Sequence, residues 1–197
     1  MSSDSPPPPN PDETDGRRRR SQDSRARIIT AVVDVIREGQ IDPTAEMVAD
    51  RAGVSLRTVF RNVSDMESLY RDIGQVVETE MRALAMRPFK GVCWRERIVE
   101  MVGRRSEGFE VLQPFRRASD LRRHASPTLQ EDRERLARTL RLILRRELPT
   151  DLDSPTIEAL DLLLSYEAWS RLRLEQGLEP AAAQQVLERA VRALIDG

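Results

Sequence analysis

The amino-acid sequence predicts an all-α protein of about nine helices, with a small N-terminal three-helix head and a larger C-terminal helical body. Hydrophobic residues recur at helical spacing along most of the chain, and the alternating runs typical of β-strands are absent. Proline and glycine stand where such helices would begin and end. The chain has 197 residues, a net charge of −1 and one cysteine, which excludes an intramolecular disulfide.

The first 16 residues are rich in proline and acidic residues, a composition that cannot bury a core and therefore predicts disorder. This segment has neither the apolar run nor the cleavage pattern of a secretory signal peptide. A first helix is expected over residues 24–38, where valine and isoleucine form a buried stripe and Gly39 ends the helix.

Two short helices joined by a tight turn are predicted within residues 44–63. The Thr44 hydroxyl is placed to cap the first helix, and Gly53 permits the sharp bend after it. Ser55 is placed to cap the second helix, over residues 56–62, whose Leu56 and Val59 are expected to face inward. The spacing favours a helix-turn-helix that enters a DNA major groove over an ordinary surface hairpin. The outer face of the second helix carries donors suited to base edges and phosphates, namely Arg57, Thr58, Arg61 and Asn62.

The run from Ile28 to Tyr70 resembles the N-terminal domain of TetR-family transcriptional regulators. The shared elements are a Thr before an Ala-containing helix, the segment Ala-Gly-Val-Ser at residues 52–55 and the segment Thr-Val-Phe at residues 58–60. A Ser-x-x-Glu-x-Leu start of the fourth helix follows, in which Ser64 and Glu67 would form a capping box. The resemblance implies a DNA-binding surface made of Thr44, Ser55, Leu56, Arg57, Thr58, Phe60, Arg61 and Asn62.

Within this surface we expect Arg57 and Arg61 to read bases, because a bidentate arginine suits guanine. Ser55 and Thr58 are expected to bind phosphate, with Ser55 also presenting the N–H groups at the start of its helix. Phe60 would pack against sugar or a thymine methyl group.

Three residues depart from the family pattern. Phe60 stands where the family usually has Tyr, and Met66 where it usually has Lys, so two phosphate contacts are missing. Val63 replaces a common aromatic residue but still fills a core position. We expect weaker operator binding as a result, because each neutralised phosphate contributes through counterion release.

Residues 17–27, RRRRSQDSRAR, hold six arginines against one acid. An arginine-rich arm in this place would compensate for the two missing phosphate contacts by lying along phosphates or by entering an adjacent minor groove. The alternative interpretation is a disordered, solvated charge run. The expected DNA contacts of the arm are Arg17, Arg18, Arg19 and Arg20.

The body is expected to be helical over residues 65–86, 94–113, 115–123, 126–148, 154–176 and 180–195, with a break or a kink at Pro114. The last two helices resemble the pair that forms a four-helix dimer bundle in TetR-family proteins, which implies a homodimer on two DNA half-sites. Burial of their apolar stripes within one chain is the alternative interpretation. The stripes are Ile157, Leu160, Leu164, Tyr166 and Ala168, then Ala183, Val186, Leu187, Ala190, Val191 and Leu194.

TetR-family members usually bind a small ligand in the helical body. Candidate pocket residues, each also explained by ordinary core packing, are Trp94, Met101, Phe109, Phe115, Leu140, Leu144 and Trp169. The single histidine, His124, lacks partners at ligand spacing, so neither a metal nor a cofactor is expected. The body also carries several arginines, which we interpret as a solvated face in preference to a site for an acidic ligand. They are Arg104, Arg105, Arg116, Arg117, Arg122 and Arg123.

These patterns predict a disordered tail at residues 1–16, a DNA-binding domain at residues 17–70 and a ligand-binding and dimerisation domain at residues 71–197. The expected function is a sequence-specific repressor that a small ligand of unknown identity releases from a palindromic operator. The alternative is a helical adaptor of the same fold that binds a protein partner and not DNA. An enzyme is not expected, because the chain has no nucleophile elbow, Walker loop or glycine-rich phosphate cradle. A cytoplasmic location is expected, because no apolar stretch approaches the roughly 20 residues of a membrane span.

Overall fold

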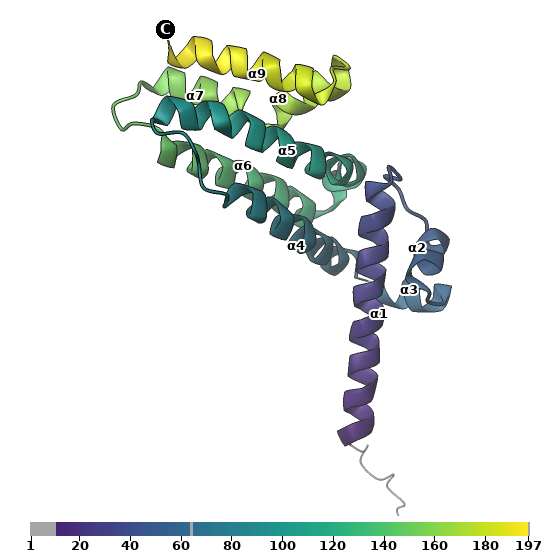
Figure 1. The fold of residues 1–197 in the computed structure, drawn as a ribbon. Helices are drawn as coiled ribbons and strands as arrows, with labels where there is room; N and C mark the ends of the chain where they lie inside the picture. Colours follow the sequence, from purple (N-terminus) through teal and green to yellow (C-terminus); the bar gives the residue numbers. More distant parts are fainter. Residues whose placement is uncertain (1–10, 64, 197) are drawn as a thin grey trace, which may run out of the picture. The chain divides into compact units, whose positions relative to one another are not determined.

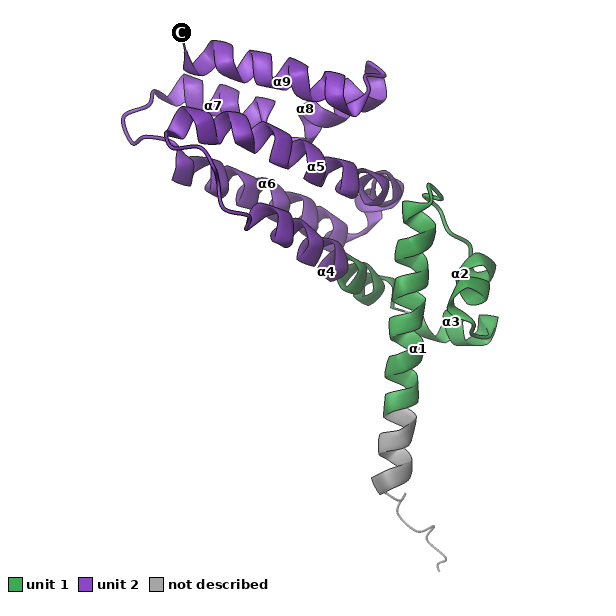
Figure 2. Cartoon of the chain, viewed as in Figure 1, with its two compact units in different colours: residues 1–73 green, residues 74–197 purple. Residues whose placement is uncertain are grey.

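The computed structural model describes the backbone of residues 11–63 and 65–196, and side chains from residue 19 onward within that part. All regular structure in this part is helical, with nine α-helices (Figure 1). They form two compact units, residues 1–73 and residues 74–197, and the boundary falls inside one helix, α4 (Met66–Ala85) (Figure 2). The predicted all-α fold class is confirmed.

The first helix of unit 1, α1 (Pro11–Arg37), begins well before residue 24, where it was expected to start. The predicted disorder is therefore wrong for residues 11–16, which are helical. Proline suits the first position of a helix, and arginine, which fills residues 17–20, has a high helix propensity. A segment that continues an already packed helix needs neither a core of its own nor a new helix nucleus. Its composition therefore does not decide whether it is helical.

Two short helices, α2 (Ala45–Ala52) and α3 (Leu56–Asn62), pack on one side of the C-terminal half of α1 (Figure 1). They confirm the predicted pair of helices. The core of unit 1 is aliphatic, and α1 supplies the larger share of it. Its buried side chains are Ile28, Ala31, Val32, Val33, Val35, Ile36, Val48, Ala49, Ala52, Val59 and Leu69.

The start of α4 is capped by a carboxylate. The Asp65 side chain accepts a hydrogen bond from the Ser68 amide at 3.0 Å, which satisfies one free N–H of the first turn. The capping box predicted for Ser64 and Glu67 involves Ser64, which lies outside the described residues.

In unit 2, α5 (Trp94–Asp120) lies in the middle (Figure 1). The helix α6 (Pro127–Glu147) packs on one side of α5, and α9 (Pro180–Ile195) packs on the other. A short 3-10 turn at Arg123–Ala125 precedes α6. The long central helix therefore organises the core of this unit.

The helix α5 runs through Pro114, so the predicted break and the separate helix at residues 115–123 are wrong. A proline inside a helix costs about 3 kcal/mol, because it removes a hydrogen bond and crowds the preceding turn. Leu112 and Phe115 on either side are buried, and each large apolar side chain contributes about 1.5–3 kcal/mol on burial. Packing thus offsets the local cost of the proline.

The single helix predicted over residues 154–176 is also wrong, because the first helix of this segment ends at residue 163. The Ser165 hydroxyl accepts a hydrogen bond from the Ala168 amide at 3.2 Å and caps a new helix. Arg105 donates to the Leu164 carbonyl at 2.6 Å, so the freed backbone groups on both sides of the break have partners. The resulting segments are α7 (Ser154–Leu163), α8 (Tyr166–Ser170) and a π-helical segment (Arg171–Glu175).

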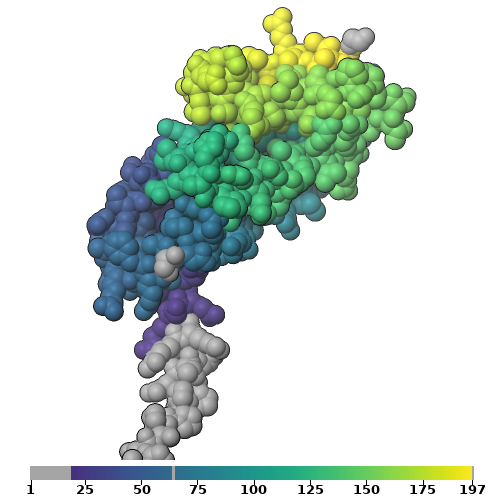
Figure 3. Space-filling view, turned by 180° about the vertical axis from the view of Figure 1, so that it is seen from behind, coloured from purple at the N-terminus to yellow at the C-terminus, as the bar shows by residue number. Residues whose placement is uncertain are grey.

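Most of the apolar stripes assigned to a dimer interface are buried inside unit 2 itself, so that assignment is wrong for these residues. Three large apolar side chains of the same segments are exposed, and one of them, Val186, belongs to the predicted stripes. Leu162, Leu174 and Val186 are 67%, 48% and 45% exposed. Val186 belongs to α9, which lies at the surface of unit 2 as the yellow segment in Figure 3. The stripe residues buried in their own chain are Ile157, Leu160, Leu164, Tyr166, Ala183, Leu187 and Val191.

Candidate nucleic-acid interface

The helix-turn-helix of unit 1 is shaped by a cap on each helix and by one glycine. The Thr44 hydroxyl accepts a hydrogen bond from the Met47 amide at 3.3 Å, and the Ser55 hydroxyl accepts one from the Thr58 amide at 3.2 Å. Between the helices, Gly53 has a φ of +60°, a conformation that glycine adopts without a Cβ penalty. These local interactions set the bend between α2 and α3.

The outer face of α3 presents Arg57, Phe60 and Arg61. Within the described part of the chain, Arg57 has no hydrogen-bond or ion-pair partner. Arg57 and Arg61 are one turn apart, so their side chains lie on the same side of the helix. Val59 is buried as predicted, but Leu56 is 37% exposed, so its expected inward orientation is wrong.

Three other residues assigned to DNA binding make hydrogen bonds within α3. The hydroxyl oxygens of Ser55 and Thr58 are 2.9 Å apart, and the Asn62 amide donates to the Thr58 carbonyl at 2.8 Å. Only one of these two hydroxyl groups donates in their mutual contact, so the other keeps its O–H to donate to a phosphate oxygen. The Asn62 side chain is turned toward its own backbone, and a base contact would require this bond to break.

The departures from the TetR-family pattern expose apolar side chains in unit 1. Phe60 is 56% exposed, and Met66 is 37% exposed. Met47 and Leu56, at 38% and 37%, add to the apolar surface of the same unit. Such side chains suit sugar and thymine methyl groups better than phosphates. The candidate surface therefore combines two arginines with apolar contact area.

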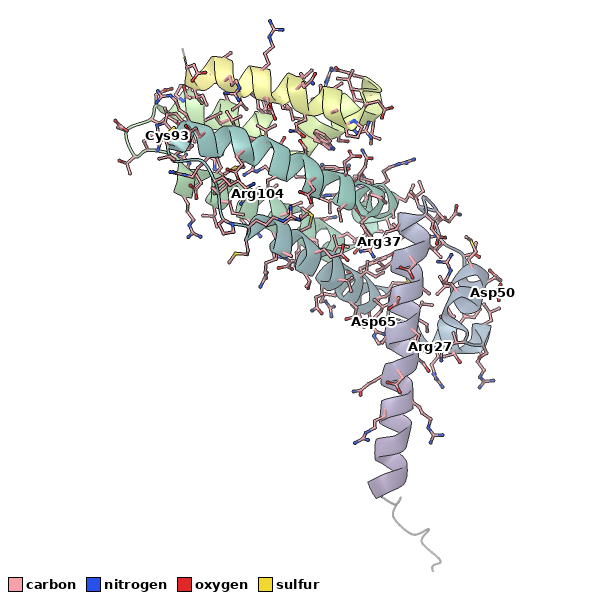
Figure 4. The ribbon with its side chains drawn as sticks, viewed as in Figure 1. Arg27, Arg37, Asp50, Asp65, Cys93 and Arg104 are labelled. Atoms are coloured by element: carbon pink, nitrogen blue, oxygen red, sulfur yellow. The ribbon has the colours of Figure 1, made fainter. Side chains whose placement is uncertain are left out.

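Two arginines counted in the predicted arm belong to the packed head. Arg25 donates to the Asp72 carboxylate at 2.7 Å and to the Ser68 hydroxyl at 2.7 Å. Arg27 lies on the side of α1 that faces α2 and α3, and donates to the Ala52 carbonyl at 2.9 Å (Figure 4). These contacts of Arg25 and Arg27 leave no local signal in the sequence, because their partners lie 25–47 residues away along the chain.

The remaining arginines of the arm are part of α1. Arg19 and Arg20 are exposed, and the side chains of Arg17 and Arg18 lie outside the described part of the structure. An α-helix is about 10–12 Å wide, whereas the minor groove is about 6 Å wide. The helix as a whole is therefore too wide to enter the minor groove, and insertion of its arginine side chains there stays a prediction. Contact with phosphates along the duplex stays a prediction.

A small cavity of about 40 Å³ lies between α4, α5 and α6 in unit 2. Its lining includes Met101, Phe109 and Leu140, three of the predicted pocket residues, together with Met81 and Leu84. The volume is far below the roughly 300–1,000 Å³ of an ordinary ligand pocket. The other predicted residues do not line it; they are Phe115, Leu144 and Trp169, which are buried, and Trp94, which is half-buried.

The arginines of the body do not form a single solvated face. Arg105 and Arg116 are only 6% and 8% exposed, so that interpretation is wrong for both. Arg105 donates to the carbonyls of Leu140 and Leu164, each at 2.6 Å, and burial lowers its pKa to about 10. Arg116 lies over the Tyr166 ring at 5.3 Å, and burial also lowers its pKa. Arg105 thus serves as an internal cap where α7 ends.

Two further kinds of feature are absent from the described part of the chain. No cluster of three or more histidine, cysteine, aspartate or glutamate side chains there is arranged to hold a metal ion. None of the helices described has both the length and the apolar character that crossing a membrane requires.

The chain matches no family model and no curated protein sequence. Solved structures of similar fold include a transcriptional regulator from Rhodococcus sp. Rha1. The match covers 88% of this chain and 96% of the regulator, with a TM-score of 0.66 and 21% identity. A candidate fatty acid metabolism regulator from Clostridium perfringens covers 87% and 97%, with a TM-score of 0.50 and 15% identity. A candidate TetR-family transcriptional regulator from Mesorhizobium loti covers 90% and 97%, with a TM-score of 0.50 and 16% identity.

These likenesses extend over the helix-turn-helix unit and the helical body together, because each covers most of both chains. At such identities they establish the fold. The chain shares its fold with these solved transcriptional regulators, one of which is a candidate member of the TetR family that residues 28–70 resemble.

Proposed function

We propose that this protein is a sequence-specific DNA-binding transcriptional regulator and not an enzyme. The observation that carries the proposal is the outer face of α3, where Arg57 and Arg61 stand exposed on a helix whose first turn is capped by the Ser55 side chain. A helix-turn-helix places its second helix in the major groove, where base edges carry a distinct pattern of donors and acceptors. The similar fold of solved transcriptional regulators supports the proposal.

Within this proposal the two arginines read bases, most favourably guanine. Phe60 contacts sugar or a thymine methyl group, since it is exposed and has no hydroxyl for a phosphate. Ser55 and Thr58 bind phosphate through their hydroxyl groups. Sequence preference therefore comes from a few groups on α3, and affinity also depends on phosphate contacts made elsewhere.

The test is selection of bound sequences from a random duplex library by the full-length protein, repeated with the Arg57→Ala/Arg61→Ala double variant. A palindromic motif is expected for the native protein and should disappear in the double variant. Arg57→Ala alone should cost about 1–3 kcal/mol on the selected site and relax one base position. Arg51→Ala is the matched control, because Arg51 is an exposed arginine of α2 that pairs with Glu38 at 2.6 Å.

Equal loss on every sequence would reassign Arg57 to the DNA backbone. No enrichment at low salt would contradict the proposal and favour the helical adaptor, for which the exposed Phe60 and Met66 would serve as protein contacts.

We further propose that the protein acts as a homodimer, since a two-fold dimer presents two recognition helices to the half-sites of a palindrome. Leu162 and Val186 supply exposed apolar surface on α7 and α9. Val186→Glu is expected to convert the dimer to a monomer in sedimentation or light-scattering measurements, because it would place a charge in an apolar contact. Leu142→Glu is the control, since Leu142 is 65% exposed on α6. An unchanged mass for Val186→Glu would place the interface elsewhere or exclude a dimer.

We also propose that a small ligand releases the protein from its operator, which makes it a repressor. The cavity lined by Met101, Phe109 and Leu140 is the candidate site. Its volume of about 40 Å³ means that a ligand must push α4, α5 and α6 apart to enter. Displacement of α4 would also move residues of unit 1, because α4 begins in unit 1 and ends in unit 2.

A further inference from the structure

The recognition helix α3 has little hydrophobic anchorage. It contains seven residues, and Val59 is its one buried side chain. A helix of this length is unstable in isolation, and a single apolar contact leaves rotation about that contact weakly restrained. The orientation of α3 must therefore depend on polar contacts at its two ends.

Arg27 of α1 reaches the turn that precedes α3. Its guanidinium donates to the carbonyl of Ala52 at 2.9 Å and to the carbonyl of Gly53 at 2.5 Å. These are acceptors at the end of α2, where a cation is also favoured by the helix dipole. A Cβ at Gly53 would stand 2.9 Å from Arg27 Nη2, so glycine leaves the space that this guanidinium occupies. Arg27 thus fixes the turn from which α3 begins.

The C-terminal end of α3 is reached by Arg25. Its Nη1 donates to the carbonyl of Asn62, the last residue of α3, at 3.3 Å. The same guanidinium is held by the Asp72 carboxylate at 2.7 Å and by the Ser68 hydroxyl at 2.7 Å, both on α4. Arg25 therefore joins α1, the end of α3 and α4 through one planar group with several donors.

We infer that Arg25 and Arg27 form an arginine clamp that fixes the orientation of α3, so that both are positioning residues for DNA reading. On a helical wheel they fall on either side of Ile28, which is fully buried, so α1 reaches α3 from two directions. The guanidinium groups bind protein carbonyls and a carboxylate, which sets them apart from the exposed Arg57. The consequence for DNA reading rests on the proposed function, whereas the clamp itself does not.

The first test needs no DNA. Amide hydrogen exchange is measured on full-length native protein, Arg27→Met and Arg25→Met, because methionine keeps an unbranched apolar side chain and removes the donors. The amides of Val59 and Val63 should exchange about tenfold faster in both variants, while those of α9 should not change. Arg51→Met is the matched control, since it removes an exposed arginine from the same unit without touching α3.

Unchanged exchange at Val59 and Val63 would overturn the clamp. Loss of the helical circular-dichroism signal in Arg27→Met would also overturn it, because Arg27 would then act on global stability. If Arg25→Met alone fails to fold, Arg27→Met and Arg25→Lys decide the matter, since lysine keeps the charge but not the planar fork.

The second test compares binding of Arg27→Met to the selected operator and to a random duplex over a range of salt concentrations. We expect about tenfold weaker operator binding, unchanged random-duplex binding and an unchanged salt slope. Equal loss on both duplexes, with a salt slope smaller by about one, would instead make Arg27 a phosphate contact. If no operator is selected, the proposed function fails, while the exchange measurement still decides the clamp.

Discussion

Trp169→Ala is expected to lower the free energy of unfolding of unit 2 by about 3–5 kcal/mol, the range for removing a large aromatic side chain from a packed core. Trp169 is fully buried, and its Nε1 donates to Glu110 at 2.9 Å. The substitution would leave a cavity and would also remove one partner of a carboxylate. Since small domains are stable by only about 5–15 kcal/mol, this loss is a large share of the total.

Denaturant unfolding followed by circular dichroism and by the fluorescence of the remaining tryptophan would measure the loss. The matched control is Trp94→Ala, because Trp94 is half-buried and Arg95 lies over its ring at 4.5 Å. We expect a cost of about 1 kcal/mol there. Similar losses for the two variants would contradict the assignment of Trp169 as a main core residue.

The helix-turn-helix could be predicted because its signals are local. A capping residue such as Thr44 or Ser55 accepts a hydrogen bond from an amide three residues further on. A glycine such as Gly53 indicates a left-handed backbone conformation at its own position. Short-range interactions of this kind leave a pattern in the sequence that does not depend on the rest of the fold.

The helix breaks of the body could not be predicted because distant contacts decide them. Pro114 suggests a break, but buried neighbours carry the helix through it. The break after α7 has a local cap at Ser165, yet Arg105, which satisfies the Leu164 carbonyl there, lies 59 residues away. Propensity is a weak guide wherever tertiary packing competes with it.

The arginines show the same limit. Arg57 and Arg27 are both exposed, and each is one charge in a basic stretch of sequence. Only the fold shows that Arg57 points away from the protein, whereas Arg27 holds a turn that lies 25 residues further along the chain. Counting charges therefore marks the basic stretch of unit 1 but does not show which arginines shape its helix-turn-helix.

Gly53→Ala is expected to destabilise unit 1 and to weaken operator binding more than it weakens binding to a random duplex. A residue with a Cβ costs about 1–2 kcal/mol in the left-handed conformation that Gly53 adopts at φ +60°. The new methyl group would also displace Arg27, whose Nη2 would stand 2.9 Å from it. Denaturant unfolding, amide exchange of α3 and affinity for the selected operator measure the separate effects.

Gly39→Ala separates backbone strain from loss of the clamp. Gly39 also has a positive φ, +97°, but a Cβ there would meet nothing within 4 Å. Both variants should lose stability, and only Gly53→Ala should speed amide exchange in α3. In a double-mutant cycle, Arg27→Met should have a smaller effect in the Gly53→Ala background than in the native protein, because the alanine has already moved the guanidinium. Additive effects would mean that Gly53 acts through its backbone alone and that Arg27 holds α3 by another route.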